Sequence, residues 1–573
     1  MSTSSAGGPP PQEALRAVPP RVAPCGPAFA FEVNTFDYII VGAGTAGCVL
    51  AARLTANGRH KVLLLEAGPS DKRFFVRMPI GYGRCFYDPT INWMYRTEPE
   101  AGLGGRRGYW PRGKLLGGSG TINAMVALRG QPADFEEWAA LGNPGWGWRD
   151  VLPYFRKLED SPFGPSAERG SGGPMKVADV SAQTHPLCHA FLQACEEAGL
   201  PRSADLNGAN AEGVSHYQIS VHQGRRVSTA TAYLRPAKER AQLQVQTLAQ
   251  VQRIGFEGRR ATQVHYTVGG ELRQARAARE VILCAGAINT PQLLQLSGVG
   301  PAPHLSALGI AVVHDSPAVG RHLQDHLCID HLYRARVPTL NEQLRPWHGK
   351  LRVGLKYLLS RQGPLALSVN QAGGFVRSRP GLSRPDLQLY FSPLSYTRSP
   401  PGKRPLMNPD PFPGFMLSAQ PCRPGSRGHV ELRSPDPLQA PRIVPNSLSD
   451  PKDLEELLHG AALLRRLAAS PALAGLVAQE MQPGPAVQTR EQMIEDIRAR
   501  CSTVFHPVST CRMGPDPAQS VVDHRLRVHG LAGLRIVDAS VFPTVTSGNT
   551  NMPVVMVAEK AADLLLEDAT LNP

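Results

Sequence analysis

The chain has 573 residues and a formal net charge of +14, with 42% hydrophobic and 19% charged residues. This length predicts at least two domains, because one hydrophobic core stops growing at about 250–300 residues. The basic residues are mostly scattered arginines, without a dense block or interleaved aromatic residues, which argues against nucleic acid binding. Ten cysteines without a Cys-x-x-Cys pair argue against a disulfide framework and favour a reducing compartment.

The first 33 residues predict a disordered tail. Residues 1–33 are rich in Pro, Ser and Ala and lack the apolar segment of a secretory signal. The prolines also disfavour the amphipathic helix of a mitochondrial presequence. No apolar run in the sequence reaches the roughly 18–20 residues that cross a bilayer. We expect a cytoplasmic protein, and contact with the surface of the inner membrane stays an open alternative.

Regular structure is predicted to begin near Phe36. Residues 37–58, DYIIVGAGTAGCVLAARLTANG, predict a buried strand, a glycine-rich turn and a helix. Residues 60–68, HKVLLLEAG, predict a second buried strand, and strand–helix–strand within about 30 residues indicates a parallel βαβ unit. Residues 70–115 have no clear periodicity, whereas residues 135–159 predict a helix, a turn and a helix.

The later segments continue this mixed pattern. Residues 243–270 predict an antiparallel meander, and residues 279–298 predict a strand followed by a helix. Residues 335–500 mix strands with amphipathic helices, and from residue 501 the pattern returns to strand, loop and helix. The sequence predicts a tail over residues 1–33 and two domains. The first domain is made of two separate segments, residues 34–334 and 501–567, and the second domain, residues 335–500, lies between them.

A Gly-x-Gly-x-x-Gly motif lies between the first predicted strand and helix. Gly42, Gly44 and Gly47 allow a tight turn and close approach of the backbone to a pyrophosphate, which the helix N-terminus also favours. Glu66 ends the next strand, where a carboxylate can accept hydrogen bonds from a ribose. The pattern predicts a dinucleotide site without separating NAD from FAD. The alternative is a turn that only packs against its strand, with Glu66 as a solvated strand end.

A second glycine-rich segment covers residues 109–130, YWPRGKLLGGSGTINAMVALRG. Its flexible backbone, with Gly117, Gly118 and Gly120, can present N–H groups to another part of an extended ligand. By itself the segment is equally consistent with an ordinary surface loop.

Six segments in fixed order resemble the glucose–methanol–choline (GMC) oxidoreductase family, and most of all its alcohol dehydrogenase and choline dehydrogenase branch. The resemblance spans residues 36–567 and implies an α/β fold (α+β overall). The implied architecture is a discontinuous Rossmann-like FAD-binding domain plus a substrate domain with an antiparallel sheet and flanking helices. The segments are FDYIIVGAGTAGCVLAARL, WPRGKLLGGSGTINAMVALRG, ILCAGAINTPQLLQLSGVGP, VGRHLQDH, HPVSTCRMG and LRIVDASVFPTVTSGNTNMPVVMVAEKAADLL.

The resemblance also implies how FAD is held. Some relatives link FAD covalently through a histidine just before the asparagine of the glycine loop. Here that position is Ile122, before Asn123, so FAD is predicted to bind non-covalently. The FAD-binding residues expected in this chain are Gly42, Gly44, Thr45, Ala46, Gly47, Glu66, Gly117, Gly118, Asn123, Ala124, Val251, Asp538, Ala539 and Asn549.

One histidine is the expected catalytic base. His506 stands midway between Cys501 and Cys511, but the four-residue gaps and the lack of a close cysteine pair argue against a metal site. A buried core histidine is the other alternative. The resemblance aligns His506 with the family's catalytic histidine, and an imidazole suits removal of a hydroxyl proton near neutral pH. Both cysteines are expected to be small buried hydrophobes.

Two asparagines follow in the segment SGNTNMP. Asn549 matches a position that holds a second His or an Asn in the family, and its amide can hydrogen-bond the substrate oxygen. The alternative role is capping of the next helix, which Asn551 could fill equally well. Asp538 and Ala539 resemble the family's contacts near the ribityl–pyrophosphate part of FAD, although Asp538 could simply cap a turn.

Gln371 is the expected substrate residue. Choline-oxidising relatives hold the trimethylammonium group with a carboxylate, and the matching position here is read as Gln371. A neutral amide pairs poorly with a quaternary cation, so an uncharged alcohol is favoured over choline. The alternative is a polar core or loop residue.

Together these features predict an FAD-dependent dehydrogenase or oxidase of CH–OH groups that converts a primary alcohol to an aldehyde. A quinone or another carrier is the expected electron acceptor, and O₂ is not excluded by the sequence. The first rival is choline dehydrogenase. Further rivals are a lyase or a fatty-acid photodecarboxylase of the same superfamily, and a flavin-binding carrier. The alcohol and the oligomeric state are not determined by the sequence.

Overall fold

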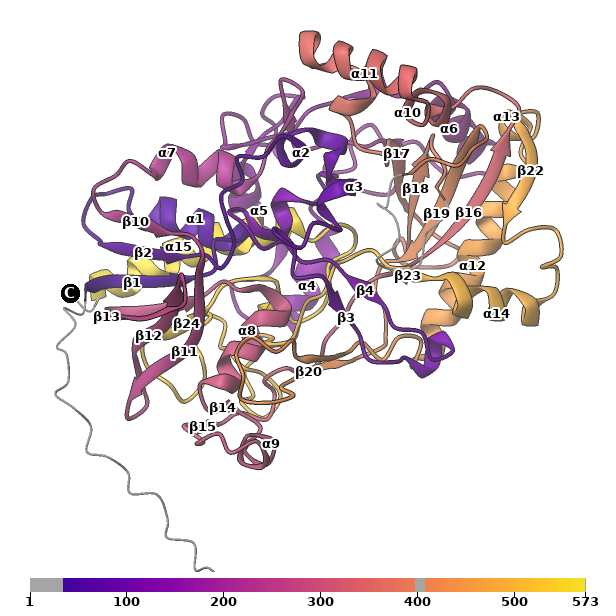
Figure 1. Ribbon diagram of the computed structural model, residues 1–573. Coiled ribbons are helices and arrows are strands. Elements are labelled where there is room, and N and C mark those ends of the chain that lie inside the picture. The colour runs from indigo at the N-terminus through magenta and orange to yellow at the C-terminus, as the bar shows by residue number, and fades with distance from the viewer. Residues whose placement is uncertain (1–33, 397–407, 572–573) are drawn as a thin grey trace, which may run out of the picture.

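The computed structural model describes residues 34–396 and 408–571 (Figure 1). The predicted tail over residues 1–33 lies outside the described residues. Two sheets dominate the molecule, one on the left of Figure 1 and one on the right. Within the described part of the chain, no helix has the length and apolarity needed to cross a membrane.

The first sheet has the order β10-β2-β1-β13-β12-β11, with β24 paired to β13. The strands β10, β2, β1 and the second half of β13 are parallel, as is β24, whereas β11, β12 and the first half of β13 form an antiparallel meander. The bounds are β1 Thr35–Val41, β2 Val62–Leu65, β10 Leu243–Gln246, β11 Ala249–Glu257, β12 Arg260–Val268, β13 Glu271–Leu283 and β24 Leu534–Ile536.

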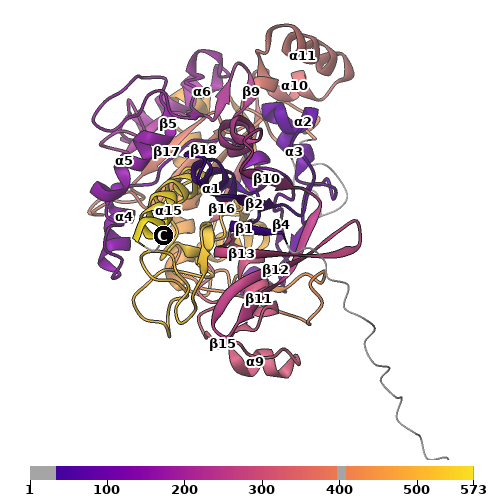
Figure 2. The same cartoon turned by 90° about the vertical axis from the view of Figure 1, so that its left-hand side faces the viewer.

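Helices from both ends of the described chain cover this sheet. Helix α1 (Thr45–Leu54) follows β1 and packs beside α15 (Asn551–Leu571) (Figure 2). Their apolar residues join those of the strands in one core, and β1 and β2 are almost wholly buried. This confirms the predicted Rossmann-like unit and shows that it needs the last helix of the chain.

The second sheet is antiparallel, with the order β17-β18-β19-β16-β22. Its strands are β16 Leu327–Ala335, β17 Ala372–Val376, β18 Leu387–Ser392, β19 Gly414–Pro421 and β22 Val477–Gln482, and β23 Ser502–Thr503 pairs with β16. Helices α6 (Leu187–Glu197) and α12 (Pro451–Ala468) pack against one face. The strand β16 belongs to this sheet although the predicted domain division falls at its last residue.

Alternation along these strands separates a core face from an open face, because neighbouring side chains point to opposite sides. Ile329, Leu389 and Leu417 lie in the core beneath the helices. The residues next to them face a cavity, which is described below. The sheet is therefore the wall of the cavity that lies opposite the first sheet.

The remaining elements are short or peripheral. The helices are α2 Phe74–Arg77, α3 Tyr82–Cys85, α4 Pro132–Ala140, α5 Trp148–Leu158, α7 Arg235–Ala237, α8 Gly286–Leu296, α9 Ala302–Ala307, α10 Leu340–Leu344, α11 Trp347–Ser360, α13 Pro471–Ala474 and α14 Arg490–Arg500. The strands are β3 Tyr95–Arg96, β4 Tyr109–Trp110, β5 Glu159–Asp160, β6 Met175–Lys176, β7 Gly213–His216, β8 Val221–His222, β9 Arg225–Arg226, β14 Val299–Gly300, β15 His314–Asp315, β20 His429–Glu431 and β21 Arg442–Val444.

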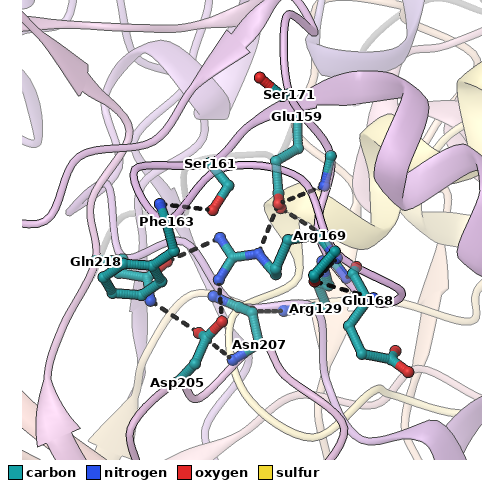
Figure 3. Close-up of polar contacts among 12 residues, drawn as sticks. Arg129, Glu159, Ser161, Phe163, Glu168, Arg169, Ser171, Asp205, Asn207 and Gln218 are labelled. Atoms are coloured by element: carbon teal, nitrogen blue, oxygen red, sulfur yellow. Dashed lines mark hydrogen bonds and ion pairs between the residues drawn. The ribbon is translucent and has the colours of Figure 1, made fainter.

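A buried group of charges fixes the end of the second glycine-rich segment (Figure 3). Glu159 pairs with Arg129 at 2.7 Å and with Arg169 at 2.6 Å, and all three side chains are buried. Arg169 continues to Asp205 at 2.5 Å. The Asn207 amide donates to the Ala127 carbonyl at 2.9 Å, so the backbone of the segment is held as well. These contacts hold the backbone that leads from the glycine loop into α4.

Candidate active site

A cavity of about 350 Å³ lies between the two sheets. One end is lined by the turn after β1, the end of β2 and the second glycine-rich loop. The other end is lined by side chains on β16, β18 and β19, and His506 and Asn549 lie between the two ends. The second sheet contributes Cys328, Asp330, Tyr390, Ser392, Met416 and Ser418 to the lining.

The first glycine turn is shaped by contacts that leave no room for side chains. Gly42 has φ +98°, and a Cβ there would lie 2.6 Å from the Cys284 carbonyl oxygen. A Cβ on Gly47 would lie 2.0 Å from the Gly42 carbonyl oxygen, so Gly47 serves the packing of α1 against the turn and does not line the cavity. Gly44, Thr45 and Ala46 do line it, at the N-terminus of α1.

Glu66 lies at the end of β2, beside this turn. Its carboxylate accepts hydrogen bonds from the Ala43 N–H at 2.9 Å and the Gly68 N–H at 2.8 Å. Burial raises the pKa of Glu66 to about 7. Each carboxylate oxygen keeps a further lone pair, so Glu66 can still accept a hydrogen bond from a ligand hydroxyl.

The second glycine loop touches the first. Gly118 has φ +53°, and a Cβ there would lie 2.8 Å from the Gly44 Cα. The Gly117 N–H donates to the Ala43 carbonyl at 2.7 Å, but Gly117 itself does not line the cavity. Farther along, Ile122, Asn123 and Ala124 line the cavity, and the Asn123 oxygen accepts a hydrogen bond from Arg226 at 2.8 Å.

The C-terminal segment completes this end. Asp538 accepts hydrogen bonds from the Gly286 N–H at 2.8 Å and the Thr290 hydroxyl at 2.6 Å, and burial raises its pKa. Ala539 and Val251 also line the cavity. Two touching glycine loops, a helix N-terminus and an acidic strand end therefore form a narrow cradle that fits a dinucleotide.

The two expected reacting side chains lie together. Asn549 Nδ2 is 3.3 Å from His506 Nε2, and both residues line the cavity. The Gln388 amide donates to Asn549 Oδ1 at 3.3 Å, and the Gln420 amide donates to Gln388 Oε1 at 3.2 Å. This chain of amides, which begins on β19, turns the NH₂ group of Asn549 toward His506.

A second histidine fixes the tautomer of His506. His326 Nε2 lies 2.9 Å from the Cys422 carbonyl oxygen, which can only accept, so this nitrogen carries a proton. The neutral His326 ring then has a bare Nδ1, which lies 3.0 Å from His506 Nδ1. His506 must donate from Nδ1, and its Nε2 is left as an acceptor on the cavity side.

Electrostatics keep His506 neutral. Burial lowers its pKa well below the usual value, and the nearby His326 and Arg112 lower it further. Burial also lowers the pKa of His326 to about 4. Asp325 accepts the backbone N–H of His506 at 2.7 Å and the hydroxyl of Thr503, and burial raises the pKa of this carboxyl to about 7. A neutral imidazole with a free Nε2 is the form needed for a base.

Gln371 is placed apart from these groups. Its side-chain oxygen accepts the His185 N–H at 2.8 Å, near the start of α6, and Gln371 does not line the cavity. Its neighbours Val369 and Asn370 line the cavity. An amide in place of a carboxylate at position 371 is therefore no argument against choline, because the side chain at this position does not face the cavity.

Sequence reasoning missed His326, Asp325 and the cavity face of β16. The segment VGRHLQDH contains both His326 and Asp325, and it was recognised as a family motif without a role. The sequence does hold one signal for this face. An apolar strand follows the motif directly, and side chains two positions apart on a strand point to the same side, so Cys328 and Asp330 both face the cavity.

A dinucleotide cradle that opens onto a histidine–asparagine pair is an arrangement suited to an oxidoreductase. Two profiles of the GMC oxidoreductase family, N-terminal and C-terminal, match residues 36–328 and 424–558. The chain therefore belongs to the GMC oxidoreductase family, which confirms the resemblance and the fold class and makes FAD the expected cofactor.

Named relatives cover nearly the whole chain. Alcohol dehydrogenase [acceptor] from Pseudomonas putida is 42% identical over 93% of this chain and 96% of its own length. Choline dehydrogenase, mitochondrial, from Homo sapiens is 42% identical over 93% of this chain and 90% of its own. The solved structure of an FAD-dependent oxidoreductase from Chaetomium thermophilum superposes with a TM-score of 0.84, at 26% identity, over 93% of this chain and all of that one (100%).

Proposed function

We propose that this chain oxidises an uncharged primary alcohol to the aldehyde, with non-covalently bound FAD. The observation that carries the proposal is the state of His506, whose tautomer is fixed by His326 and whose Nε2 faces the cavity beside Asn549. Alcohol oxidation needs a base for the hydroxyl proton and a donor for the oxygen, and this pair supplies both.

The proposed roles follow from the hydrogen bonds. His506 Nε2 accepts the hydroxyl proton, while Nδ1–H remains donated to His326. The Asn549 NH₂ group donates to the substrate oxygen and stabilises the alkoxide charge that develops. When bound, FAD supplies the two-electron acceptor for the carbinol hydride.

The residues that would hold FAD come from four parts of the chain. We propose contacts from the first glycine turn, Glu66, the second glycine loop and Asp538, all of which surround one end of the cavity. Ile122 lines the cavity next to Asn123. A hydrocarbon side chain cannot form the histidyl link of some relatives, so this position supports non-covalent binding.

The substrate end of the cavity supports two candidates. Tyr390, Met416 and Val369 offer apolar surface for a carbon chain, which favours an uncharged alcohol. Asp330 also lines the cavity, and a carboxylate there favours choline as the second candidate. Relatives named for both activities match this chain equally well, at 42% identity.

The electron acceptor is proposed to be a quinone or another carrier. Support comes from the relative named alcohol dehydrogenase [acceptor]. We also propose peripheral contact with a membrane, where lipid-soluble acceptors are found.

The test is an anaerobic visible spectrum of the purified holoenzyme, titrated separately with aliphatic alcohols, an aromatic alcohol and choline. Bleaching of the flavin by an uncharged alcohol supports the proposal, and bleaching by choline alone transfers it to the second candidate. His506→Ala should slow flavin reduction by about 100-fold or more. The control is His222→Ala, since this histidine is exposed. An unchanged rate in His506→Ala would remove the assigned base.

A further inference from the structure

Helix α11 carries an apolar stripe that no part of the described chain covers. Its leucines Leu351, Leu355, Leu358 and Leu359 are between 50% and 85% exposed, and Trp347 at its start is 76% exposed. Figure 1 shows α11 standing at the rim of the molecule. Large exposed apolar patches of this kind mark interaction surfaces in soluble proteins.

The exposed residues share one face of the helix. At about 100° per residue, the stripe from Trp347 to Leu359 covers roughly 120° of the helix circumference. Val353 and Tyr357 are the buried residues of α11, and they lie on roughly the opposite side. The helix therefore sits on the protein by one face and presents leucines outward on the other.

Basic residues border the stripe. Arg352 and Lys356 lie along one side and Lys350 along the other, and all three are exposed. None of the ion pairs among residues 34–396 and 408–571 includes them. The sequence also contains no Asp or Glu between residues 343 and 385. The surface is thus apolar at its centre, apart from the exposed His348 in the first turn, and cationic at its margins.

A second pair of exposed aromatic residues lies beside the helix. Phe74 and Phe75 on α2 are 53% and 37% exposed, and the Phe74 ring meets the Tyr357 ring at 6.5 Å. Tyr357 and Val353 belong to the same apolar cluster as Tyr82 and Val369, which line the cavity. The exposed face and the substrate end of the cavity are therefore joined through one core.

We propose that α11, with Phe74 and Phe75, docks the protein onto an anionic lipid bilayer. A helix of 14 residues is too short to cross a bilayer, but it can lie in the interface with its leucines among the acyl chains. The basic residues beside the stripe then lie close to the lipid phosphates, whose negative charge complements theirs. This surface gives the membrane contact of the proposed function a location and does not depend on which alcohol is oxidised.

The test is flotation of the purified holoenzyme with vesicles of phosphatidylcholine alone or mixed with phosphatidylglycerol. The wild type should float with the anionic vesicles, and high salt should weaken this binding. The triple variant L351N/L355N/L359N should bind at least about tenfold less well. The variant K350E/R352E/K356E should lose roughly 100-fold in affinity.

The controls separate this surface from general effects. Leu272→Asn and Leu438→Asn remove exposed leucines elsewhere, 62% and 74% exposed, and should bind as the wild type does. His506→Ala should also bind normally, so a failure of the proposed chemistry stays distinct. Wild-type protein that ignores anionic vesicles, or α11 variants that bind them fully, would overturn the proposal. So would a wild-type dimer that the leucine variants dissociate, because a second copy would then occupy this face.

Discussion

His326 does not line the cavity, but it determines the state of His506, which does. His326 accepts from His506 Nδ1 and donates to the Cys422 carbonyl, so it keeps His506 Nε2 free of a proton. Hydrogen bonds to the far nitrogen of an imidazole set its tautomer. At metal sites the loss of such a partner commonly costs 10–100-fold, and we take this as the scale for His326.

We therefore expect His326→Ala to lower kcat by about 10–100-fold. His326 also lowers the pKa of His506, so the acidic limb of the kcat/KM profile should move to higher pH in this variant. The sign follows because the proposed base must be neutral to accept a proton, and a higher pKa means that His506 is protonated at a higher pH. Burial and Arg112 remain, so the limb should stay below the pH of an ordinary histidine.

The conservative variant His326→Gln is the matched control. A glutamine can donate a hydrogen bond from its NH₂ group to the Cys422 carbonyl, and its oxygen can accept a hydrogen bond from the His506 Nδ1–H. It should recover much of the rate and most of the pH profile. A profile that is unchanged in His326→Ala would show that the tautomer is set by another group.

The residue scale also shows what the sequence could predict. The roles expected for His506 and Asn549 rest on a family motif, and the structure places the two side chains next to each other. His326 lies 180 positions from His506 in the chain, so nothing local in the sequence links them. Gln371 shows a different limit: the sequence assigned it to the substrate, whereas its side chain is held by the His185 N–H outside the cavity, and His185 is 186 positions away in the chain.

At the scale of elements, the two glycine loops form one cradle because they touch. A Cβ on Gly118 would meet the Gly44 Cα at 2.8 Å. Gly118→Ala should therefore separate the loops and weaken FAD retention by about tenfold or more, since the cradle works through close backbone approach. Gel filtration followed by the ratio of flavin to protein absorbance measures this.

Gly104→Ala is the control for the backbone conformation itself. Gly104 has φ +64°, close to the φ +53° of Gly118, but a Cβ there meets nothing within 4 Å. Both variants carry a similar strain, and only one carries the clash. Equal flavin loss in the two would assign the effect to strain and not to contact between the loops.

The buried charges of Figure 3 hold the other end of the same loop. Glu159 is 1% exposed, and its single carboxylate pairs with both Arg129 and Arg169. Glu159→Gln leaves two buried cations without this partner, and the free energy of unfolding should fall by about 3–5 kcal/mol. Chemical denaturation measures the change.

An exposed pair provides the comparison. Glu257 binds Arg276 at 2.6 Å, with side chains 54% and 42% exposed. Glu257→Gln should change the free energy of unfolding far less than Glu159→Gln does, because solvent screens such pairs. If the two glutamine variants lost equal stability, burial would not be the reason for the cost at Glu159.

Elements with a strong local pattern were predictable, and those held by distant contacts were not. The strands β1 and β2 and helix α1 are apolar runs around a glycine turn, and they form where expected. Residues 70–115 hold only short pieces such as α2 and β3, whose shape depends on tertiary contacts. The membership of β16 in the second sheet likewise depends on pairing with β19 and β22, both far along the chain.

On the scale of the whole molecule, the chain leaves the first sheet and returns to it. The second sheet is built largely between these two visits. Its Gln388 amide donates to Asn549, and the Cys422 carbonyl, directly after β19, accepts from His326, which in turn accepts from His506. The side chains proposed to react come from the segment that returns to the first sheet. The groups that orient them lie on the strands of the second sheet or directly beside those strands. The site therefore exists only when both parts are folded against each other.

Glu559 on α15 anchors the C-terminal helix to α1, and so to the first sheet. Its carboxylate is fully buried and receives both Arg53 Nη2 at 2.6 Å and Arg53 Nε at 2.8 Å from α1. The Tyr233 hydroxyl donates to it at 2.7 Å, and Lys157 lies 3.3 Å away. Three segments that are distant in sequence thus converge on one carboxylate near the C-terminus.

Glu559→Gln should lower the free energy of unfolding by about 2–3 kcal/mol, less than for Glu159, because Arg53 is partly exposed and water can hydrate it. Denaturation followed by both flavin fluorescence and far-UV circular dichroism measures this. The two signals should shift together, since α15 packs beside α1 and shares one core with the strands that flank the glycine turn. The control Glu567→Gln lies on the same helix with a side chain 61% exposed and should change stability little. If the flavin fluorescence shifted and the circular dichroism did not, α15 would unfold separately from the rest of the core around the first sheet.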